Sequence, residues 1–457
     1  MNNVIDYINV SRERYVDELK TLLAIPSISA LPEHAADVRR CAEWCMGEMG
    51  RVGLQNVRLM DTPGHPVVYG DWLGAEGAPT ILFYGHYDVQ PVDPLDLWES
   101  PPFEGTVRDG EIYARGAADD KGQVFMHLKA IEAHLKQTGR LPVNIKILLE
   151  GEEEVGSIHL DDFIRAHRAE LAADVVVISD STMFARGVPS ICYGLRGLVY
   201  FQLDLRGSST DLHSGSFGGA VANPAFVLAQ MIAQMKDRGG HIKVPGFYDD
   251  VVPLQEAERQ AWGSLPFNEK QYRKAFGIPK VHGESGYTTL ERTWARPTLE
   301  VNGLLSGFTG EGAKTVLPAV AMAKISMRLV PNQDPEKIAD LFERHAKKLA
   351  PSTVQLTVTR MHGGKPWMTS FDNPFVQAAG RAIETGFGRA PVFTREGGSI
   401  PVVSTFQEEL GLPSVLFGVG LPDENAHAPN EKLDLGNFHN GIIASAVLYE
   451  EIGKLRG

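Results

Sequence analysis

The stretch Thr80-Ile-Leu-Phe-Tyr-Gly-His86-Tyr-Asp88-Val89 decides the fold. The five residues before Gly85 suit a buried strand, and a histidine and a carboxylate follow where that strand ends. In an extended segment residues i and i+2 point to the same side, so we expect His86 and Asp88 to lie together. Imidazole is a common zinc ligand, and a carboxylate on its other ring nitrogen fixes the tautomer. Taken alone, the pattern also fits an ordinary surface loop.

Two more apolar strands are expected to end in acidic residues. The strand at 143–149 runs into Glu150-Gly-Glu152-Glu153-Glu154, and the strand at 175–178 runs into Ser179-Asp180-Ser181. A helix from about 123 to 137 precedes them, which predicts an α/β layer. Such sheets bind ligands beyond the carboxyl ends of their strands. Clustered negative charge is costly there unless a cation is present, so a metal site is indicated.

Composition narrows the class of protein. The 457 residues carry a net charge of -13 and no long Lys/Arg run, which argues against nucleic-acid binding. No apolar run approaches the length that crosses a bilayer, so no membrane partner is expected. The first residues lack the pattern of a signal peptide, and the chain has only three cysteines. These features predict a cytoplasmic location.

The order of elements predicts one domain interrupted by another. A helix is expected over residues 4–24, and after about Gly187 the texture changes to alternating strands and helices of α+β type. Residues 239–297 show no clear periodicity. We therefore expect a discontinuous domain, 1–187 and 366–457, with residues 188–365 inserted as a second, smaller domain.

Six motifs then occur in a fixed order, and with them the chain resembles a known family. They are GHYDV (85–89), GAADDKG (116–122), EGEEEVGS (150–157), ISDS (178–181), DLHSGSFGG (211–219) and ENAHAPNEK (424–432). Together they resemble the two-metal aminoacylase–carboxypeptidase superfamily of metallopeptidases. Further motifs resemble its cytosolic non-specific dipeptidase and carnosinase branch: PGFYDDVVPL (245–254), HGGKPW (362–367) and TREGGSIP (394–401). The resemblance implies a catalytic domain with a central mixed sheet flanked by helices, interrupted by an α+β lid and dimerisation domain.

The resemblance also implies a ligand set for two divalent ions. Asp119 would bridge both ions, and its peptide bond to Asp120 is cis in relatives. Asp88 would bind no metal itself and would orient the imidazole of His86. The remaining ligands would be His86 and Asp180 for one ion, and Glu154 and His427 for the other. Zinc suits this mixture of imidazoles and carboxylates, and manganese or cobalt would also be accepted.

Catalysis is expected to use a water shared by the two ions. Such a pair acidifies the water and polarises the scissile carbonyl, and a carboxylate that binds no metal must carry the proton. Counting back from Gly156-Ser157, as relatives are arranged, assigns this general base to Glu153. By the same resemblance His213 would stabilise the oxyanion, reaching across from the lid of the other subunit. That role implies a homodimer formed through the inserted domain.

The inserted domain would also hold the substrate. Arg328 matches the position that clamps the substrate carboxylate, a role suited to the guanidinium fork. Thr315 and His362 in the inserted domain, and Ser399 in the second part of the discontinuous domain, match further substrate contacts of the dipeptidases. On its own sequence pattern, Arg328 in an alternating strand also fits a solvated surface residue.

The function expected first is therefore a metal-dependent dipeptidase that cleaves a peptide bond next to a free C-terminal carboxylate. A second hypothesis keeps the metals and changes the substrate, giving an N-acyl-amino-acid deacylase or a desuccinylase-type amidohydrolase. A third is a non-catalytic scaffold of the same fold. The scaffold hypothesis predicts that a ligand or the base has been lost, and none of those six positions is missing here.

Overall fold

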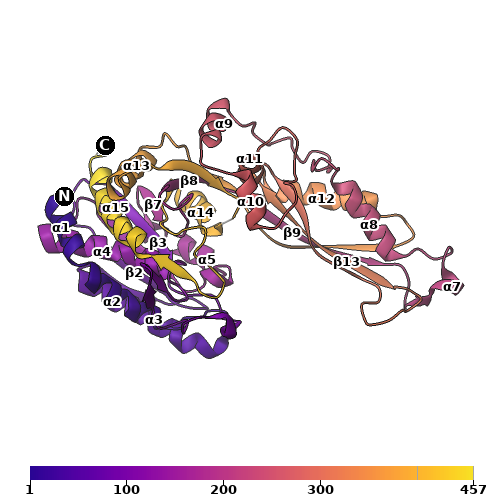
Figure 1. Ribbon diagram of the computed structural model, residues 1–457, viewed down its shortest axis with the longest axis horizontal. Coiled ribbons are helices and arrows are strands. Elements are labelled where there is room, and N and C mark those ends of the chain that lie inside the picture. The colour runs from indigo at the N-terminus through magenta and orange to yellow at the C-terminus, as the bar shows by residue number, and fades with distance from the viewer. Residues whose placement is uncertain (399, 456–457) are drawn as a thin grey trace. The chain divides into compact units, whose positions relative to one another are not determined.

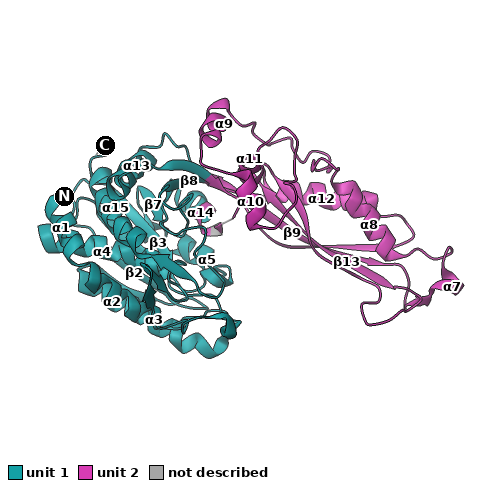
Figure 2. Cartoon of the chain, in the orientation of Figure 1, with its two compact units in different colours: residues 1–193, 369–394, 405–457 teal, residues 194–368, 395–404 magenta. Residues whose placement is uncertain are grey.

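A computed structural model describes residues 1–398 and 400–455 of the protein. Over these residues the chain forms two compact units, which Figure 2 distinguishes by colour. Unit 1 comprises residues 1–193, 369–394 and 405–457, and unit 2 comprises residues 194–368 and 395–404. Each unit has its own hydrophobic core.

Unit 1 is built on a central mixed sheet. Its strands lie in the order β1 (Gln55–Met60), β2 (Val67–Trp72), β6 (Asn144–Glu150), β3 (Thr80–His86), β7 (Val175–Ile178), β17 (Ser414–Leu416) and β8 (Ser190–Leu195). The four strands β6, β3, β7 and β17 are parallel, and the pairs at either side are antiparallel. The last two residues of β8 belong to unit 2, where β15 (Trp367–Met368) pairs with them; β16 (Val392–Glu396) also pairs with β8.

Helices cover this sheet, as the α/β prediction requires (Figure 1). The helix α4 packs on β3 and against four other helices, α1, α2, α3 and α15, and its first fourteen residues are all buried. The helices of unit 1 are α1 (Asn2–Val10), α2 (Arg12–Leu23), α3 (Ala35–Val52), α4 (Lys121–Thr138), α5 (Leu160–Ala166), α6 (Arg168–Leu171), α13 (Pro374–Phe387) and α15 (Leu435–Gly453). The short α14 (Pro401–Thr405) begins in unit 2. Among the described residues, no helix combines the length and apolarity that crossing a bilayer requires.

The single helix expected over residues 4–24 is wrong, because the chain forms two helices there. The break is at Ser11, which ends α1 and precedes α2 with φ -96° and ψ 3°. Both helices bury apolar side chains, Val4 and Ile8 from the first and Tyr15 and Leu19 among those of the second. Their apolar positions run on at nearly one helical period, so the sequence does not reveal the break.

A small second sheet in unit 1 joins segments that lie far apart in the sequence. It has the order β18 (Lys432–Asp434), β5 (Glu111–Tyr113) and β4 (Thr106–Arg108), all antiparallel. Because β18 begins at the last residue of the ENAHAPNEK motif and β5 precedes the GAADDKG motif, this sheet brings the two motifs together.

Unit 2 is organised around a four-stranded antiparallel sheet. Its order is β11 (Thr298–Ser306), β13 (Val320–Leu329), β9 (Gly197–Arg206) and β14 (Gln355–Gly364). The strands β9 and β13 alternate buried and half-buried side chains along their length. The buried face packs against α8 (Pro224–Met235) and α12 (Pro335–Leu349), which share one hydrophobic core with it. This alternation is the reason the strands could be predicted.

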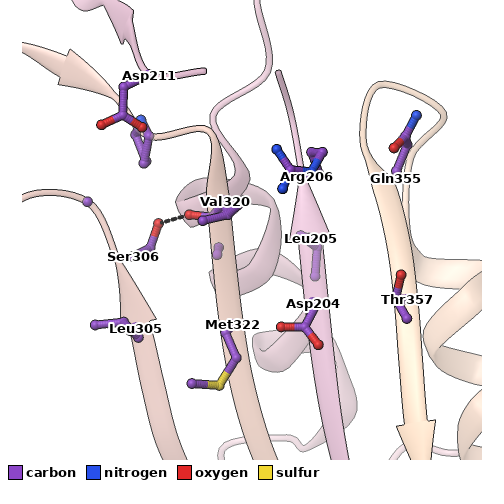
Figure 3. Close-up of a pocket in the computed structure, with 13 residues that line it drawn as sticks. Asp204, Leu205, Arg206, Asp211, Leu305, Ser306, Val320, Met322, Gln355 and Thr357 are labelled. Atoms are coloured by element: carbon purple, nitrogen blue, oxygen red, sulfur yellow. Dashed lines mark hydrogen bonds between the residues drawn. The ribbon is translucent and has the colours of Figure 1, made fainter. Parts of the chain in front are cut away.

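A ribbon of two short strands extends from one end of this sheet. It consists of β10 (Leu212–His213) and β12 (Val316–Leu317), and the short helix α7 (Ser214–Phe217) follows β10. Figure 3 shows a pocket beside this ribbon, lined by residues from β9, β11, β13 and β14, with Ser306 donating to the carbonyl of Val320.

The stretch 239–297, which lacks periodicity, contains three short helices. They are α9 (Glu256–Gly263), α10 (Glu269–Ala275) and α11 (Thr289–Trp294). Each spans at most eight residues and buries at most two of them, such as Trp262 in α9. Because so few side chains are buried, no apolar stripe marks these helices in the sequence.

Candidate metal centre and substrate-binding residues

The three acidic or histidine-bearing strand ends of unit 1 meet at one edge of the sheet. In the parallel register His86 lies opposite Glu150, and Tyr84 lies opposite Ile178. The chain therefore turns at the same level after all three strands. These turns hold His86, the pair Glu153 and Glu154, and Asp180, as the strand pattern predicts.

Asp119 lies between two imidazoles. One carboxylate oxygen is 3.0 Å from His86 Nε2, and the other is 2.9 Å from His427 Nε2. The residue comes from the loop between β5 and α4, and His427 comes from the loop before β18. The peptide bond between Asp119 and Asp120 is cis, which confirms the expectation drawn from relatives.

Two groups of potential metal ligands share this carboxylate. In each group the ligand atoms lie within 4.8 Å of one another. The first group is His86, Asp119 and Asp180, and the second is Asp119, Glu154 and His427. The structure thus brings together all five residues predicted to bind metal; that they do bind metal stays a prediction.

The charges of this cluster fit a pair of divalent cations. Burial raises the pKa of Asp180 above its usual range, and the charge of Asp119 raises it further. Hydrogen bonds to Asp119 and Glu154 raise the pKa of His427 to about 10. Both shifts reflect negative charge gathered in one buried place, and divalent cations would neutralise that charge. Two imidazoles with three carboxylates form a donor set that zinc and manganese both accept.

A third acidic group in unit 1 is of another kind. It consists of Glu18, Glu48 and Glu132, which also lie within ligand distance of one another. The buried ammonium of Lys129 donates to all three carboxylates. Since this position is already filled by a positive charge, the group is a buried ion-pair network.

Asp88 contacts both the histidine and the acidic turn. The Nδ1 atom of His86 is 3.1 Å from the backbone oxygen of Asp88 and 3.4 Å from its carboxylate. The same carboxylate accepts hydrogen bonds from the backbone N–H groups of Glu153 and Glu154, at 3.3 and 3.1 Å, and from Ser29. It therefore holds the turn after β6 in register with His86.

Hydrogen-bond partners distinguish the three consecutive glutamates, Glu152, Glu153 and Glu154, from one another. Glu152 turns away from the cluster, accepting from the backbone of His65 and contacting His159 Nδ1 at 2.8 Å. Glu154 belongs to the second ligand group and accepts from Gln90 at 2.7 Å. Glu153 lies between these two, as the sequence register requires.

The electrostatic surroundings of Glu153 favour a proton on its carboxylate in the metal-free protein. Burial raises its pKa, the charge of His86 lowers it, and the carboxylates of Glu154 and Asp119 raise it again, to about 8. Divalent cations beside it would lower this value by charge attraction.

In unit 2, His213 and Thr315 lie next to each other on the ribbon. His213 pairs with Val316, and Ser214 donates its N–H to the carbonyl of Thr315 at 3.1 Å. The imidazole is exposed, and its Nδ1 accepts from the N–H groups of Gly215 and Ser216 at 3.0 and 3.3 Å. Since Nδ1 is an acceptor, the proton of the neutral ring is on Nε2.

Arg328 and His362 lie toward the other end of the unit 2 sheet. Arg328 is opposite Leu198 near the start of β9, and His362 stacks on Tyr200 with ring centroids 5.1 Å apart. Burial lowers the pKa of Arg328 from its ordinary value. The fourth predicted substrate contact, Ser399, lies outside the described residues.

A second guanidinium near Arg328 is not singled out by the sequence. Arg196 and Arg328 line one cavity of about 390 Å³ in unit 2. Burial, followed by the charge of Arg328, lowers the pKa of Arg196 to about 10.

The sequence also gives no role to Glu431, although this residue lies in the ENAHAPNEK motif.

Comparison with known proteins gives consistent results over the whole chain. Residues 82–451 match a sequence model described as "Peptidase family M20/M25/M40". "Cys-Gly metallodipeptidase dug1" of Schizosaccharomyces pombe is 35% identical over 100% of this chain and 99% of its own length. Human "Beta-Ala-His dipeptidase" is 33% identical over 100% of this chain and 93% of its own. Among solved structures, a "M20 family metallo-carboxypeptidase Sso-CP2" from Sulfolobus solfataricus is 34% identical with a TM-score of 0.85, over 96% of this chain and 99% of that chain.

Proposed function

This chain belongs to peptidase family M20/M25/M40 and is a dinuclear metallohydrolase, and from that premise we propose that it is a dipeptidase. It would cleave a peptide bond next to a free C-terminal carboxylate. The relatives at 35% and 33% identity are both named as dipeptidases. The observation that carries the proposal is the Asp119 carboxylate shared between two ligand groups, with Glu153 near enough for the charge of Asp119 to raise its pKa.

The five converging residues would hold the two cations. His86 and Asp180 would take one ion, Glu154 and His427 the other, and Asp119 would serve both. We propose zinc as the first choice, with manganese or cobalt also accepted at this oxygen-rich set. Two such ions, when bound, acidify a water and polarise the carbonyl that it attacks.

Glu153 would act as the general base and then as the general acid. It would accept the proton of the attacking water and pass it to the leaving amine. Asp88 fixes the backbone of this turn through its two N–H contacts, so the carboxylate of Glu153 is held in place. The backbone oxygen of Asp88 also contacts Nδ1 of His86 and holds the ring in its orientation.

The polar groups of unit 2 would bind the substrate. The guanidinium of Arg328 suits the C-terminal carboxylate, with His362 nearby on the same sheet. Ser399 remains a proposed contact from the sequence resemblance. His213 would donate its Nε2–H to the oxyanion, because Gly215 and Ser216 already occupy Nδ1.

The spacing of these residues within unit 2 favours a site shared by two subunits. Arg328 pairs near the start of β9, and the ribbon with His213 begins beyond Arg206 at its other end. The eight residue-to-residue steps from Leu198 to Arg206 span about 26 Å at a strand rise of about 3.3 Å per residue. An extended dipeptide spans only about 7 Å. One substrate can therefore meet Arg328 of one subunit and His213 and Thr315 of the partner subunit.

This arrangement requires a homodimer, which we propose forms through unit 2. Its edge strand β11 exposes the apolar side chains of Val301, Leu304 and Leu305. Exposed apolar side chains on an edge strand are suited to pairing with another chain. Unit 1 would then be the catalytic domain, and unit 2 the lid and dimerisation domain.

A cytoplasmic location is part of the proposal. Cys41 and Cys45 lie one helical turn apart in α3, and both are buried as free thiols. Thiols in this state are usual for proteins of a reducing compartment.

Substrate class is tested by comparing a dipeptide with an N-acetyl amino acid that ends in the same residue. The proposal predicts release of the amino acid from the dipeptide at a rate far above that from the acetyl compound. Faster release from the acetyl compound would instead assign the chain to the N-acyl-amino-acid deacylases. No release from either compound by the metal-loaded protein would favour a non-catalytic scaffold.

A further inference from the structure

Glu431 places a fully buried carboxylate beneath the loop that carries Asp119. Its Oε1 accepts from the N–H groups of Ala118 and Asp119 at 2.9 and 3.1 Å. Its Oε2 accepts from the N–H of Gly116 at 2.9 Å and from Arg115 Nη1 at 2.7 Å. The side chain has no exposed surface. Four donors thus compensate a charge that would otherwise be costly to bury.

These contacts tie together the loops of two proposed ligands. Glu431 follows His427 by four residues, and its partners span the segment that ends at Asp119 itself. The backbone oxygen of Glu431 also accepts from the N–H of Ala114 at 3.0 Å. One residue therefore fixes both the backbone before Asp119 and the end of the His427 loop.

A purely structural role for Glu431 would be to close the small sheet. That sheet, however, is already closed by the backbone pairing of Lys432 with Tyr113 and of Asp434 with Glu111. Three of the four groups that donate to the Glu431 carboxylate are backbone N–H groups of the Asp119 loop. The carboxylate is thus directed at the position of Asp119 more than at the sheet.

We propose that Glu431 is the positioning residue that sets the Asp119 carboxylate between His86 and His427. The inference rests on the proposed role of Asp119 as the ligand shared by two cations. Loss of the Glu431 charge frees the backbone of residues 116–119. The two oxygens of the Asp119 carboxylate are then no longer held between His86 and His427. The expected consequence is weaker cation binding, before any substrate is present.

The test is a cobalt titration of the metal-free protein and of Glu431→Gln, followed by visible absorption and calorimetry. Glu431→Gln is expected to bind cobalt about 10- to 100-fold more weakly, the usual effect of removing a residue that orients a ligand. Its cobalt spectrum should also differ from that of the wild type. The matched control is Glu132→Gln, which removes another buried carboxylate whose partners are Tyr7, Arg14, Arg51 and Lys129.

The control separates positioning from general loss of stability. Glu132→Gln should lower the melting temperature and leave cobalt affinity and spectrum unchanged. Wild-type cobalt binding by Glu431→Gln, or equal weakening in both variants, would overturn the inference. If Glu431→Gln does not fold, the double variant Arg115→Met/Glu431→Gln removes the buried ion pair as a whole and leaves no unpaired charge. The same weakening of cobalt binding is expected from it.

Failure of this inference is distinct from failure of the proposed function. If Glu431 has no positioning role, the wild type still hydrolyses dipeptides while cobalt binding by Glu431→Gln is unchanged. If the chain is no dipeptidase, weakened cobalt binding by Glu431→Gln still establishes the positioning role. Cobalt affinity and dipeptide turnover are therefore recorded on the same protein samples.

Discussion

His213 lies in the ribbon beyond one end of the unit 2 sheet, and Arg328 lies toward the opposite end of that sheet. Arg328 is opposite Leu198 near the start of β9, whereas the ribbon bearing His213 follows the other end of that strand. About 26 Å of strand separates the two ends, at a rise of about 3.3 Å per residue. Since both residues are proposed to touch one dipeptide, each active site would then need a contribution from two chains.

Complementation between two inactive variants tests this sharing. Glu153→Ala and His213→Ala should each be nearly inactive alone. When they are unfolded together and refolded as mixed dimers, one site of each heterodimer combines an intact Glu153 with an intact His213. Random pairing should restore about a quarter of the wild-type turnover, because half of the dimers are mixed and each has one good site.

The control for complementation is each variant refolded alone, which should stay inactive. Recovery of activity in the mixture alone supports the shared site. An inactive mixture that contains heterodimers, shown by mass spectrometry of tagged chains, would mean that His213 acts within its own subunit.

Removal of the Glu153 carboxylate should abolish turnover and leave the cations in place. Glu153→Ala is expected to lower kcat by about 10²- to 10⁴-fold, the usual contribution of a general base. Metal content measured by atomic emission should stay at the wild-type level, because Glu153 belongs to neither ligand group. Turnover that survives the substitution would show that another residue is the base.

Gly215 should matter for the imidazole that it supports. A Cβ added there would lie 2.9 Å from His213 Cε1 and 3.2 Å from Nδ1, closer than ordinary contact allows. Gly215→Ala should therefore displace the ring and lower kcat by roughly tenfold, part of the effect of losing an oxyanion donor. Metal content should not change.

Ser216→Ala is the matched control for this loop, since it removes a side chain and keeps the N–H that donates to His213. It should retain wild-type kcat. Equal loss of kcat in both variants would show that the loop, and not the position of the ring, is the sensitive feature.

The buried network around Lys129 predicts how stability depends on pH. Burial raises the pKa of Glu132, but the hydrogen bond from Arg14 and the charge of Lys129 together lower it by more. The net result is a pKa that falls from 4.5 to about 2. A carboxylate whose pKa is lowered on folding stabilises the protein above its unfolded pKa and loses that effect as pH falls toward its folded pKa. The lowering corresponds to roughly 3 kcal/mol at about 1.4 kcal/mol per pKa unit.

Melting temperatures measured between pH 7 and pH 2 test this linkage. The wild type should lose stability as the pH falls below about 4.5. Glu132→Gln should melt lower at pH 7, and the difference from the wild type should shrink as the pH approaches 2. A difference that stays constant over this range would mean that the Glu132 charge contributes nothing.

The meeting of the strand ends at one edge of the sheet could be predicted because its signals are local. A run such as Thr80–His86 is apolar up to the histidine, and the parallel register then places the other strand ends beside it. The identity of the ligand set came from motif order and from family resemblance. Strand periodicity alone left His86 and Asp88 open to a loop interpretation.

Features that depend on distant contacts could not be predicted. The partners of Glu431 lie more than 300 residues away in the sequence, and no local pattern marks a buried carboxylate that accepts four hydrogen bonds. The break at Ser11 likewise has no local mark, because the apolar spacing continues across it. The proton position on His213 depends on a turn that only the folded chain shows.

The most direct test of the account is the number of cations that dipeptide hydrolysis requires. The protein is stripped with a chelator, and zinc or manganese is returned in steps while bound metal and release of amino acid from a dipeptide are both measured. We predict no turnover without metal, and full turnover when two ions are bound per chain, because Asp119 serves two ligand groups. Full turnover with a single ion per chain, or in the stripped protein, would contradict the account.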